Sequence, residues 1–259
     1  MQKRGTMKTF KIALVFILSA VTLLTACQNE TTYLQIVGVP PVKSALKDII
    51  SAFREEEKGK KIRIRALYER PVDIYNDVNG GNSGANIVIM INSNWFTNLA
   101  TANKLSNVEK FGKDVLVLVG SVHAQDSIES PSELVPLFAN RYLGISDPIG
   151  NVLGQFSLEI LKYYKIYDNL KDKLRYFSDA STVLQATEIS QIDYSILYHT
   201  EFISSDHVKI VYTFPQESHT PVIYSMGIVS YNYDDISKKF IDYVHSKRAQ
   251  DILKSYGFQ

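Results

Sequence analysis

The chain has 259 residues, with 28 Lys+Arg against 27 Asp+Glu, a formal net charge of +1, and a single cysteine. This length allows one large domain or two modest ones, with enough residues for a sizeable hydrophobic core. The charge balance lacks the basic excess that a general nucleic-acid-binding protein would show. One cysteine excludes both an intramolecular disulfide framework and a cysteine-rich zinc site.

The N-terminus has the pattern of an export signal. Four basic residues flank the start of an apolar run over residues 12–24, which is too short to cross a bilayer comfortably. The run ends in the sequence LTAC, which resembles the lipobox of bacterial lipoproteins, with Cys27 as the acylated residue. We predict a lipoprotein signal peptide over residues 1–26 and a short polar tether over residues 27–32. The alternative is an ordinary secretory signal followed by an incidental cysteine.

Cleavage of this signal would change the charge of the protein. Residues 1–26 contain four basic residues and no acidic ones, so the mature chain would have 24 Lys+Arg against 27 Asp+Glu. Two or three acyl chains on Cys27 would anchor it stably, where a single chain would be marginal. No later run of 18 apolar residues occurs, so we expect the rest of the chain to lie outside the membrane.

The first half of the mature chain alternates predicted strands and helices. Strands are expected over residues 33–39, 61–67 and 86–91, where apolar residues alternate or run together. Apolar residues at helical spacing predict helices over residues 42–58 and 72–78. This order of elements is typical of parallel βαβ units.

The second half continues the same alternation. A helix is expected after Asp147-Pro148, another after Asp179 or Ser181 as its cap, and a single long helix over residues 236–256 with Gly257 at its end. Further strands are expected over residues 115–119, 142–145, 174–177, 194–198, 207–214 and 222–230. Two α/β blocks facing each other would place a ligand cleft at the carboxyl ends of their strands.

This order of segments resembles the extracytoplasmic solute-binding proteins of ABC importers, in particular the molybdate-binding family. Residues 213–224, TFPQESHTPVIY, are similar to the family's TFPEDSHPPIVYP. Residues 144–148, GISDP, match IAIGDP, and residues 193–198, DYSILY, match DAGIVY. The ending AQDILKSYGF, residues 249–258, matches GQAILRKYGF. The resemblance covers residues 34–258, nearly the whole mature chain.

The resemblance implies a two-lobed α/β fold of the type II periplasmic-binding-protein class. Each lobe would be a mostly parallel sheet flanked by helices, with two crossover segments between the lobes. One lobe would comprise residues 33–114 plus 222–259, and the other residues 115–221. The implied function is capture of a molybdate- or tungstate-like oxyanion in the cleft between the lobes, without catalysis, cofactor or metal, for delivery to an ABC permease. The protein would be a monomer, lipid-anchored outside the cytoplasm of a bacterium, in the periplasm or at the cell surface.

The family's oxyanion shell, which consists of backbone N–H groups at helix N-termini, serine hydroxyls and one tyrosine hydroxyl, is altered in this chain. Pro41 stands at the first serine position, before Val42 at the helix start, and offers neither a hydroxyl nor an N–H. Glu69 stands at the second serine position, between Tyr68 and Arg70. A carboxylate facing a dianion would repel it, unless Arg70 neutralises the carboxylate or binds the anion itself.

Two other parts of the shell are retained. Tyr198 matches the family's tyrosine. At the third site Asn151, before Val152, replaces a valine whose backbone N–H is the donor, an exchange that leaves the backbone in place. Three outcomes follow: the site takes molybdate or tungstate with a rebuilt shell, it takes a different, larger or zwitterionic solute, or it has lost transport binding. The rival class is a surface interaction protein with the same fold.

An enzyme is disfavoured, because the chain has no Gly-x-Ser-x-Gly motif and no P-loop. The five histidines form no metal-binding pattern, and we interpret His219 as structural.

Overall fold

The computed structural model describes residues 31–58, 61–91, 93–124, 127–130, 133–202 and 205–259. The predicted signal peptide, Cys27 and the first residues of the predicted tether lie outside these ranges. Among the described residues, no helix has the length and apolar character needed to cross a membrane.

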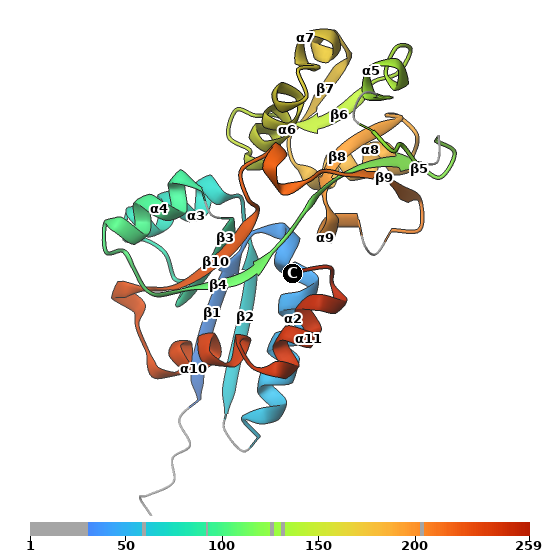
Figure 1. The fold of residues 1–259 in the computed structure, drawn as a ribbon. Coiled ribbons are helices and arrows are strands. Elements are labelled where there is room, and N and C mark those ends of the chain that lie inside the picture. The colour runs from blue at the N-terminus through green and yellow to red at the C-terminus, as the bar shows by residue number, and fades with distance from the viewer. Residues whose placement is uncertain (1–30, 59–60, 92, 125–126, 131–132, 203–204) are drawn as a thin grey trace, which may run out of the picture.

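The chain forms two lobes, each built around one five-stranded sheet (Figure 1). The first sheet has the strand order β2-β1-β3-β10-β4. Its strands are β1 (Thr32–Gly38), β2 (Ile62–Tyr68), β3 (Ile87–Ile91), β4 (Leu105–Lys113) and β10 (Ile223–Val229). The helices of this lobe are α2 (Lys43–Glu56), α3 (Pro71–Asn79), α4 (Asn94–Thr101), α10 (Asp235–Val244) and α11 (Lys247–Ser255).

The second sheet has the order β7-β6-β8-β5-β9. Its strands are β5 (Leu116–Ser121), β6 (Leu143–Ser146), β7 (Leu174–Phe177), β8 (Tyr194–Tyr198) and β9 (Val208–Thr213). Its helices are α5 (Leu134–Leu137), α6 (Val152–Tyr163), α7 (Tyr167–Leu170), α8 (Ala180–Glu188) and α9 (His199–Phe202). Short 3-10 turns lie at Pro40–Val42, Lys171–Lys173, Gln216–Ser218 and Ser230–Asn232.

Both sheets are mixed, with one reversed strand in each. In the first sheet β10 is antiparallel to its neighbours β3 and β4, whereas the pairs that β1 makes with β2 and β3 are parallel. In the second sheet β5 is antiparallel to β8 and β9, whereas the pairs that β6 makes with β7 and β8 are parallel. The predicted two-lobed α/β fold is confirmed. Strands β3 and β8 are buried along their whole length, as expected where helices cover both faces of a sheet.

Two crossover segments join the lobes, one between β4 and β5 and one between β9 and β10. Asp114 lies in the first crossover and is 1% exposed. Its carboxylate accepts hydrogen bonds from the Thr200 hydroxyl at 2.6 Å, the Val115 N–H at 2.8 Å and the Tyr224 hydroxyl at 3.3 Å. Because Thr200 belongs to α9 of the second lobe and Tyr224 to β10 of the first, this one side chain connects the two lobes at the hinge.

The structure adds the short helices α5, α7 and α9 to the predicted elements and differs more substantially at two places. The sequence over residues 92–114 gave no predicted element, whereas the structure has α4 and the edge strand β4 there. The prediction of one helix over residues 236–256 was wrong, because the segment is split into α10 and α11. Ser246 starts the second helix by accepting a hydrogen bond from the Ala249 N–H at 3.2 Å.

The C-terminus closes onto the first sheet. Gly257 has φ +83°, as the left-handed position after a helix requires, and the N–H groups of Gly257 and Phe258 donate to the carbonyls of Lys254 and Leu253. Gln259 then exchanges two backbone hydrogen bonds with Lys113, at 2.9 and 3.0 Å. The last residue therefore pairs with the end of β4, next to the first crossover.

Candidate functional site

A cleft of about 450 Å³ opens between the lobes. Its walls are the loops and helix starts that follow the carboxyl ends of the strands, where open α/β sheets bind ligands. The first lobe contributes Val39, Pro40, Pro41, Lys43, Tyr68, Arg70, Pro71 and Ile91. The second lobe contributes Asn151, Val152, Asp179, Ala180, Ser181, Thr182, Tyr198 and Glu201.

Four helix N-termini reach this cleft, two from each lobe. Those of α2 and α3 follow β1 and β2, and those of α6 and α8 follow β6 and β7. A helix N-terminus attracts anions through its unpaired N–H groups and its partial positive charge. The backbone dipoles by themselves therefore favour negative charge in the cleft from both sides, before the side chains at each helix start are considered.

The first lobe begins its helices with proline, which has no N–H to donate. Pro40 and Pro41 open the turn before α2, and Pro71 is the first residue of α3. Neither helix start has a side-chain cap. The Val42 N–H donates to the Val39 carbonyl at 3.2 Å, so it is already used.

The second lobe begins its helices with polar caps. The Asn151 side chain accepts a hydrogen bond from the Leu153 N–H at 3.0 Å. Asp179 accepts one from the Thr182 N–H at 2.8 Å, and the Thr182 hydroxyl completes a reciprocal capping box. A ligand at these two helix starts would compete with a side chain that already occupies an N–H group.

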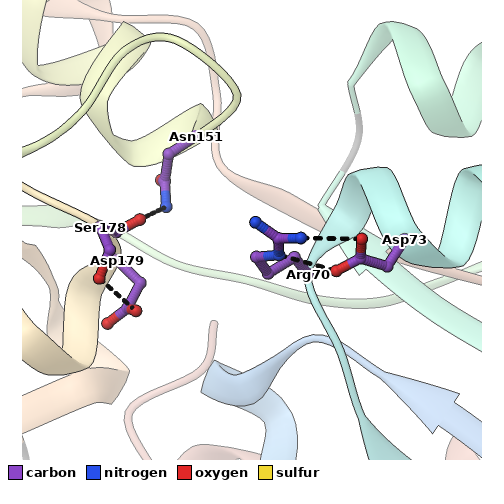
Figure 2. Close-up of polar contacts among 5 residues, drawn as sticks. All are labelled: Arg70, Asp73, Asn151, Ser178 and Asp179. Carbon is purple, nitrogen blue, oxygen red and sulfur yellow. Dashed lines mark hydrogen bonds and ion pairs between the residues drawn. The ribbon is translucent and has the colours of Figure 1, made fainter.

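Two cations belong to the wall of the first lobe. Arg70 forms a bidentate ion pair with Asp73, at 2.7 and 3.0 Å, with its guanidinium directed toward the other lobe (Figure 2). The Arg70 side chain is 70% exposed. Since a guanidinium has five N–H donors, these two bonds leave three for a ligand. Lys43 lies over the Tyr68 ring, 5.9 Å from its centre.

Two carboxyl groups belong to the wall of the second lobe. Burial opposes ionisation of Asp179, but hydrogen bonds from Thr182 and Ser178 outweigh it and lower the pKa of Asp179. Glu201 behaves oppositely: burial, helped by the negative charges of Asp114 and Asp179, raises the pKa of Glu201 to about 7. Figure 2 shows Asn151, Ser178 and Asp179 facing Arg70 across the cleft.

Tyr198 and Glu201 each present a buried polar atom to this region. Tyr198 is 2% exposed, and its hydroxyl has no hydrogen-bond partner among the residues that the structure describes. The same holds for the Oε2 atom of Glu201. Burial, with Asp114 and Glu201 nearby, raises the pKa of the Tyr198 hydroxyl, so it stays a neutral donor. Buried polar groups are normally paired, so these two atoms mark a place for a ligand or water.

The structure brings six of the eight predicted ligand residues to the cleft. These are Pro41, Tyr68, Arg70, Asn151, Val152 and Tyr198. Val42 is fully buried instead, and Glu69 does not belong to the cleft wall. Arg70 pairs with Asp73 rather than Glu69, and burial together with Asp77 and Asp73 raises the pKa of Glu69.

Sequence reasoning did not include Lys43, Asp179 and Glu201 among the site residues. The sequence does point to Asp179, because it predicts a helix cap there. Helix caps that follow neighbouring parallel strands gather at one edge of the sheet. Glu201 comes three residues after the end of β8, which is the same kind of position. Within the described ranges, no group of three or more His, Cys, Asp or Glu side chains is placed to hold a metal ion.

Comparison with known proteins places the chain in a family. Residues 34–259 match the model of the bacterial extracellular solute-binding proteins, and the chain belongs to this family. The members are solute-binding proteins rather than enzymes; those that serve ABC importers bind small solutes and an ABC permease, and the family works outside the cytoplasm.

The individual relatives confirm the predicted resemblance to molybdate-binding proteins. The molybdate-binding protein ModA of Haemophilus influenzae is 29% identical over 178 residues, covering 67% of this chain and 70% of that protein. YvgL of Bacillus subtilis, assigned as an ABC transporter substrate-binding lipoprotein, is 28% identical over 60% of this chain and 58% of its own. The periplasmic molybdate-binding protein of Azotobacter vinelandii shares the fold, with a TM-score of 0.72 and 14% identity, over 87% of this chain and 98% of its own.

Proposed function

We propose that this protein captures a small anionic solute between its lobes and delivers it to an ABC permease, with molybdate- and tungstate-like oxyanions as the first candidates. One observation carries the proposal: four helix N-termini, two cations and the unpaired Tyr198 hydroxyl meet in one cleft between two hinged lobes. The relatives add support, because two of those compared are named for molybdate binding.

Closure of the lobes would be the step that the solute stabilises. The cleft has contributions from both lobes, so a solute between them gains contacts only when they approach. A ligand shifts such an equilibrium only by its tighter binding to the closed state. The crossovers at Asp114 and at residues 214–222 are the segments that would bend.

Thermal unfolding of the purified protein tests this function. A solute at 100 times its Kd raises the free energy of unfolding by about 2.7 kcal/mol, which for a chain of this size is a shift of about 5–10 °C. We expect that shift with molybdate or tungstate, and a smaller one in Tyr198→Phe, which loses only the hydroxyl. Tyr163→Phe, an exposed tyrosine outside the cleft wall, is the matched control. No shift with these or any other small anion would overturn the proposal.

We also propose that a lipid on Cys27 anchors the protein to the membrane. The sequence before Cys27 supports this, as does the lipoprotein assignment of YvgL. Metabolic labelling with a radioactive fatty acid should mark the wild-type protein, and Cys27→Ser should abolish the label and release the protein into the aqueous phase of a detergent partition. Labelling that survives Cys27→Ser would exclude this anchor.

A further inference from the structure

The two walls of the cleft carry opposite charge. Lys43 and Arg70 line it from the first lobe, and Asp179 and Glu201 line it from the second. Asp73 balances part of the Arg70 charge and takes two of its five N–H donors. Three guanidinium N–H groups remain for a ligand anion. On the second lobe no lysine or arginine belongs to the described cleft wall. The cleft is therefore polarised from one lobe to the other.

A tetrahedral oxyanion fits only one side of this arrangement. Its oxygen atoms accept hydrogen bonds and donate none while it is fully ionised. Against the second lobe it would meet the Asp179 carboxylate, which is held ionised by its hydrogen bonds, and the Glu201 carboxyl on the same wall. Like charges at short range repel, so the second lobe favours a ligand group that is positive or donates hydrogen bonds.

The two unpaired buried atoms also call for a ligand with both an acceptor and a donor of hydrogen bonds. The Tyr198 hydroxyl is a donor without an acceptor, and the Oε2 atom of Glu201 is an acceptor without a donor among the described residues. One ligand that satisfies both atoms must carry an acceptor and a donor. A solute with an anionic group and an ammonium group does so and also matches the charges of the two walls.

The rest of the lining fits an organic solute. Val39, Pro40, Pro41, Pro71 and Ile91 give the first lobe an apolar surface, and Tyr198 lines the cleft from the second lobe. A volume of about 450 Å³ falls in the range of sites for organic ligands, which are mostly apolar with a few placed polar groups.

We infer that the solute is a small organic zwitterion, whose anionic group lies against Lys43, Arg70 and the Tyr198 hydroxyl and whose ammonium group lies against Glu201 and Asp179. This inference rests on the proposed function, since it names the ligand class of the same cleft. It differs from the first candidates of that function in requiring a positive group on the ligand.

Matched pairs of probes that differ only in an amino group test this inference. Calorimetry at pH 7.5 on the purified protein would compare 2-aminoethylphosphonate with ethylphosphonate, taurine with ethanesulfonate, and β-alanine with propionate. Molybdate and tungstate are included as anions without a donor group. We expect at least one amino compound to bind at least tenfold more tightly than its partner, and more tightly than either oxyanion.

Variants test whether the second lobe causes the preference for amino compounds. Glu201→Gln should reduce the amino preference at least fivefold, while Glu129→Gln, an exposed glutamate outside the cleft wall, should leave it unchanged. Arg70→Gln should weaken the binding of the amino compound and of its partner equally, because Arg70 contacts the anionic group that both share. Circular dichroism of each variant checks that the fold is retained.

The outcomes separate this inference from the function on which it rests. Equal affinity within every pair, or tight molybdate binding without amino preference, overturns the zwitterion and leaves anion capture standing. Oxyanion binding that strengthens as pH falls through 7, and that Glu201→Gln makes independent of pH, also overturns it, because Glu201 would then act as a protonated donor that the glutamine amide replaces. Binding of none of the probes counts against both proposals.

Discussion

The two lobes present their helix starts to the cleft in different ways, although their sheets have the same arrangement. In each sheet the first three parallel strands lie side by side and one reversed strand follows. The first lobe starts α2 and α3 with prolines and no side-chain cap, whereas the second starts α6 and α8 with Asn151 and Asp179 as caps. In the first lobe proline removes an N–H donor from each helix start, and in the second a side chain occupies one N–H at each start.

This difference decides how a ligand can be held on each side. An anion can displace a cap from an N–H group, but it cannot obtain a donor from proline. On the first lobe it must use the side chains of Lys43 and Arg70 instead. The same scaffold can therefore offer backbone dipoles or side-chain charges, according to the residue at each helix start.

The largest effect that we expect is the change of folding stability with pH that results from protonation of Asp114, the carboxyl group in the first crossover. Burial, opposed by hydrogen bonds from Thr200 and Val115, raises the pKa of Asp114 to about 6, above its usual 3.8. The folded state thus binds this proton more tightly than the unfolded state, so its contribution to stability is fullest below pH 4 and is lost as pH rises to 6. The loss amounts to about 3 kcal/mol.

Denaturant unfolding of the wild type and Asp114→Asn between pH 4 and pH 6.5 measures this contribution. The wild type should lose up to about 3 kcal/mol relative to the variant over this interval, with little further change above it. Glu201→Gln should remove a separate component that extends to about pH 7, where the pKa of Glu201 lies. Parallel pH profiles for the wild type and Asp114→Asn would show that the hinge carboxyl keeps its ordinary pKa.

The next effect separates the two kinds of helix start. Asp179→Ala removes the capping box of α8 and should lower the free energy of unfolding by about 1–2 kcal/mol. Asp179→Asn, which keeps an accepting oxygen, should lower it by less than half as much. If both variants unfold at the same denaturant concentration as the wild type, the cap contributes nothing to stability.

The smallest effect lies on the first lobe. Pro71→Ala should lower the free energy of unfolding by only about 0.4–1 kcal/mol, chiefly because the unfolded chain becomes more flexible. It also gives α3 an N–H that faces the cleft, so a simple oxyanion should bind more tightly to the variant. Calorimetry with tungstate measures this change, and unchanged or weaker binding would mean that the missing donor does not limit the site.

The sequence predicts the buried elements well and the exposed ones poorly. Strand β3 is a continuous apolar run because both its faces are covered, so its pattern is unmistakable. The edge strand β4 has an exposed middle with Glu109 and Lys110, which reads as a loop. The break between α10 and α11 depends on the cap at Ser246, which interrupts the apolar stripe for only two residues.

The sequence predicts site residues only where they lie at or just after the end of a single strand. Tyr198 ends a predicted strand, Arg70 and Asn151 come shortly after one, and the resemblance to a known family placed all three in one cleft. The opposition of Lys43 and Arg70 to Asp179 and Glu201 depends on how two lobes face each other. No local pattern encodes how the two lobes face each other. The raised pKa of Glu201 arises chiefly from burial and, after that, from Asp114, which is distant in sequence.

The insertion of β10 between β3 and β4 has a consequence for the order of folding. Strand β4 pairs with β10 and with the C-terminal Gln259, and both are synthesised after the whole second sheet. The second sheet uses one continuous stretch of chain, from Leu116 to Thr213, and can form as soon as that stretch is available. In the first sheet β1, β2 and β3 can pair early, but β4 joins only when β10 and Gln259 are available, and such long-range pairing is slow. Until then β4 is an unpaired edge, the kind of surface on which partly folded chains associate.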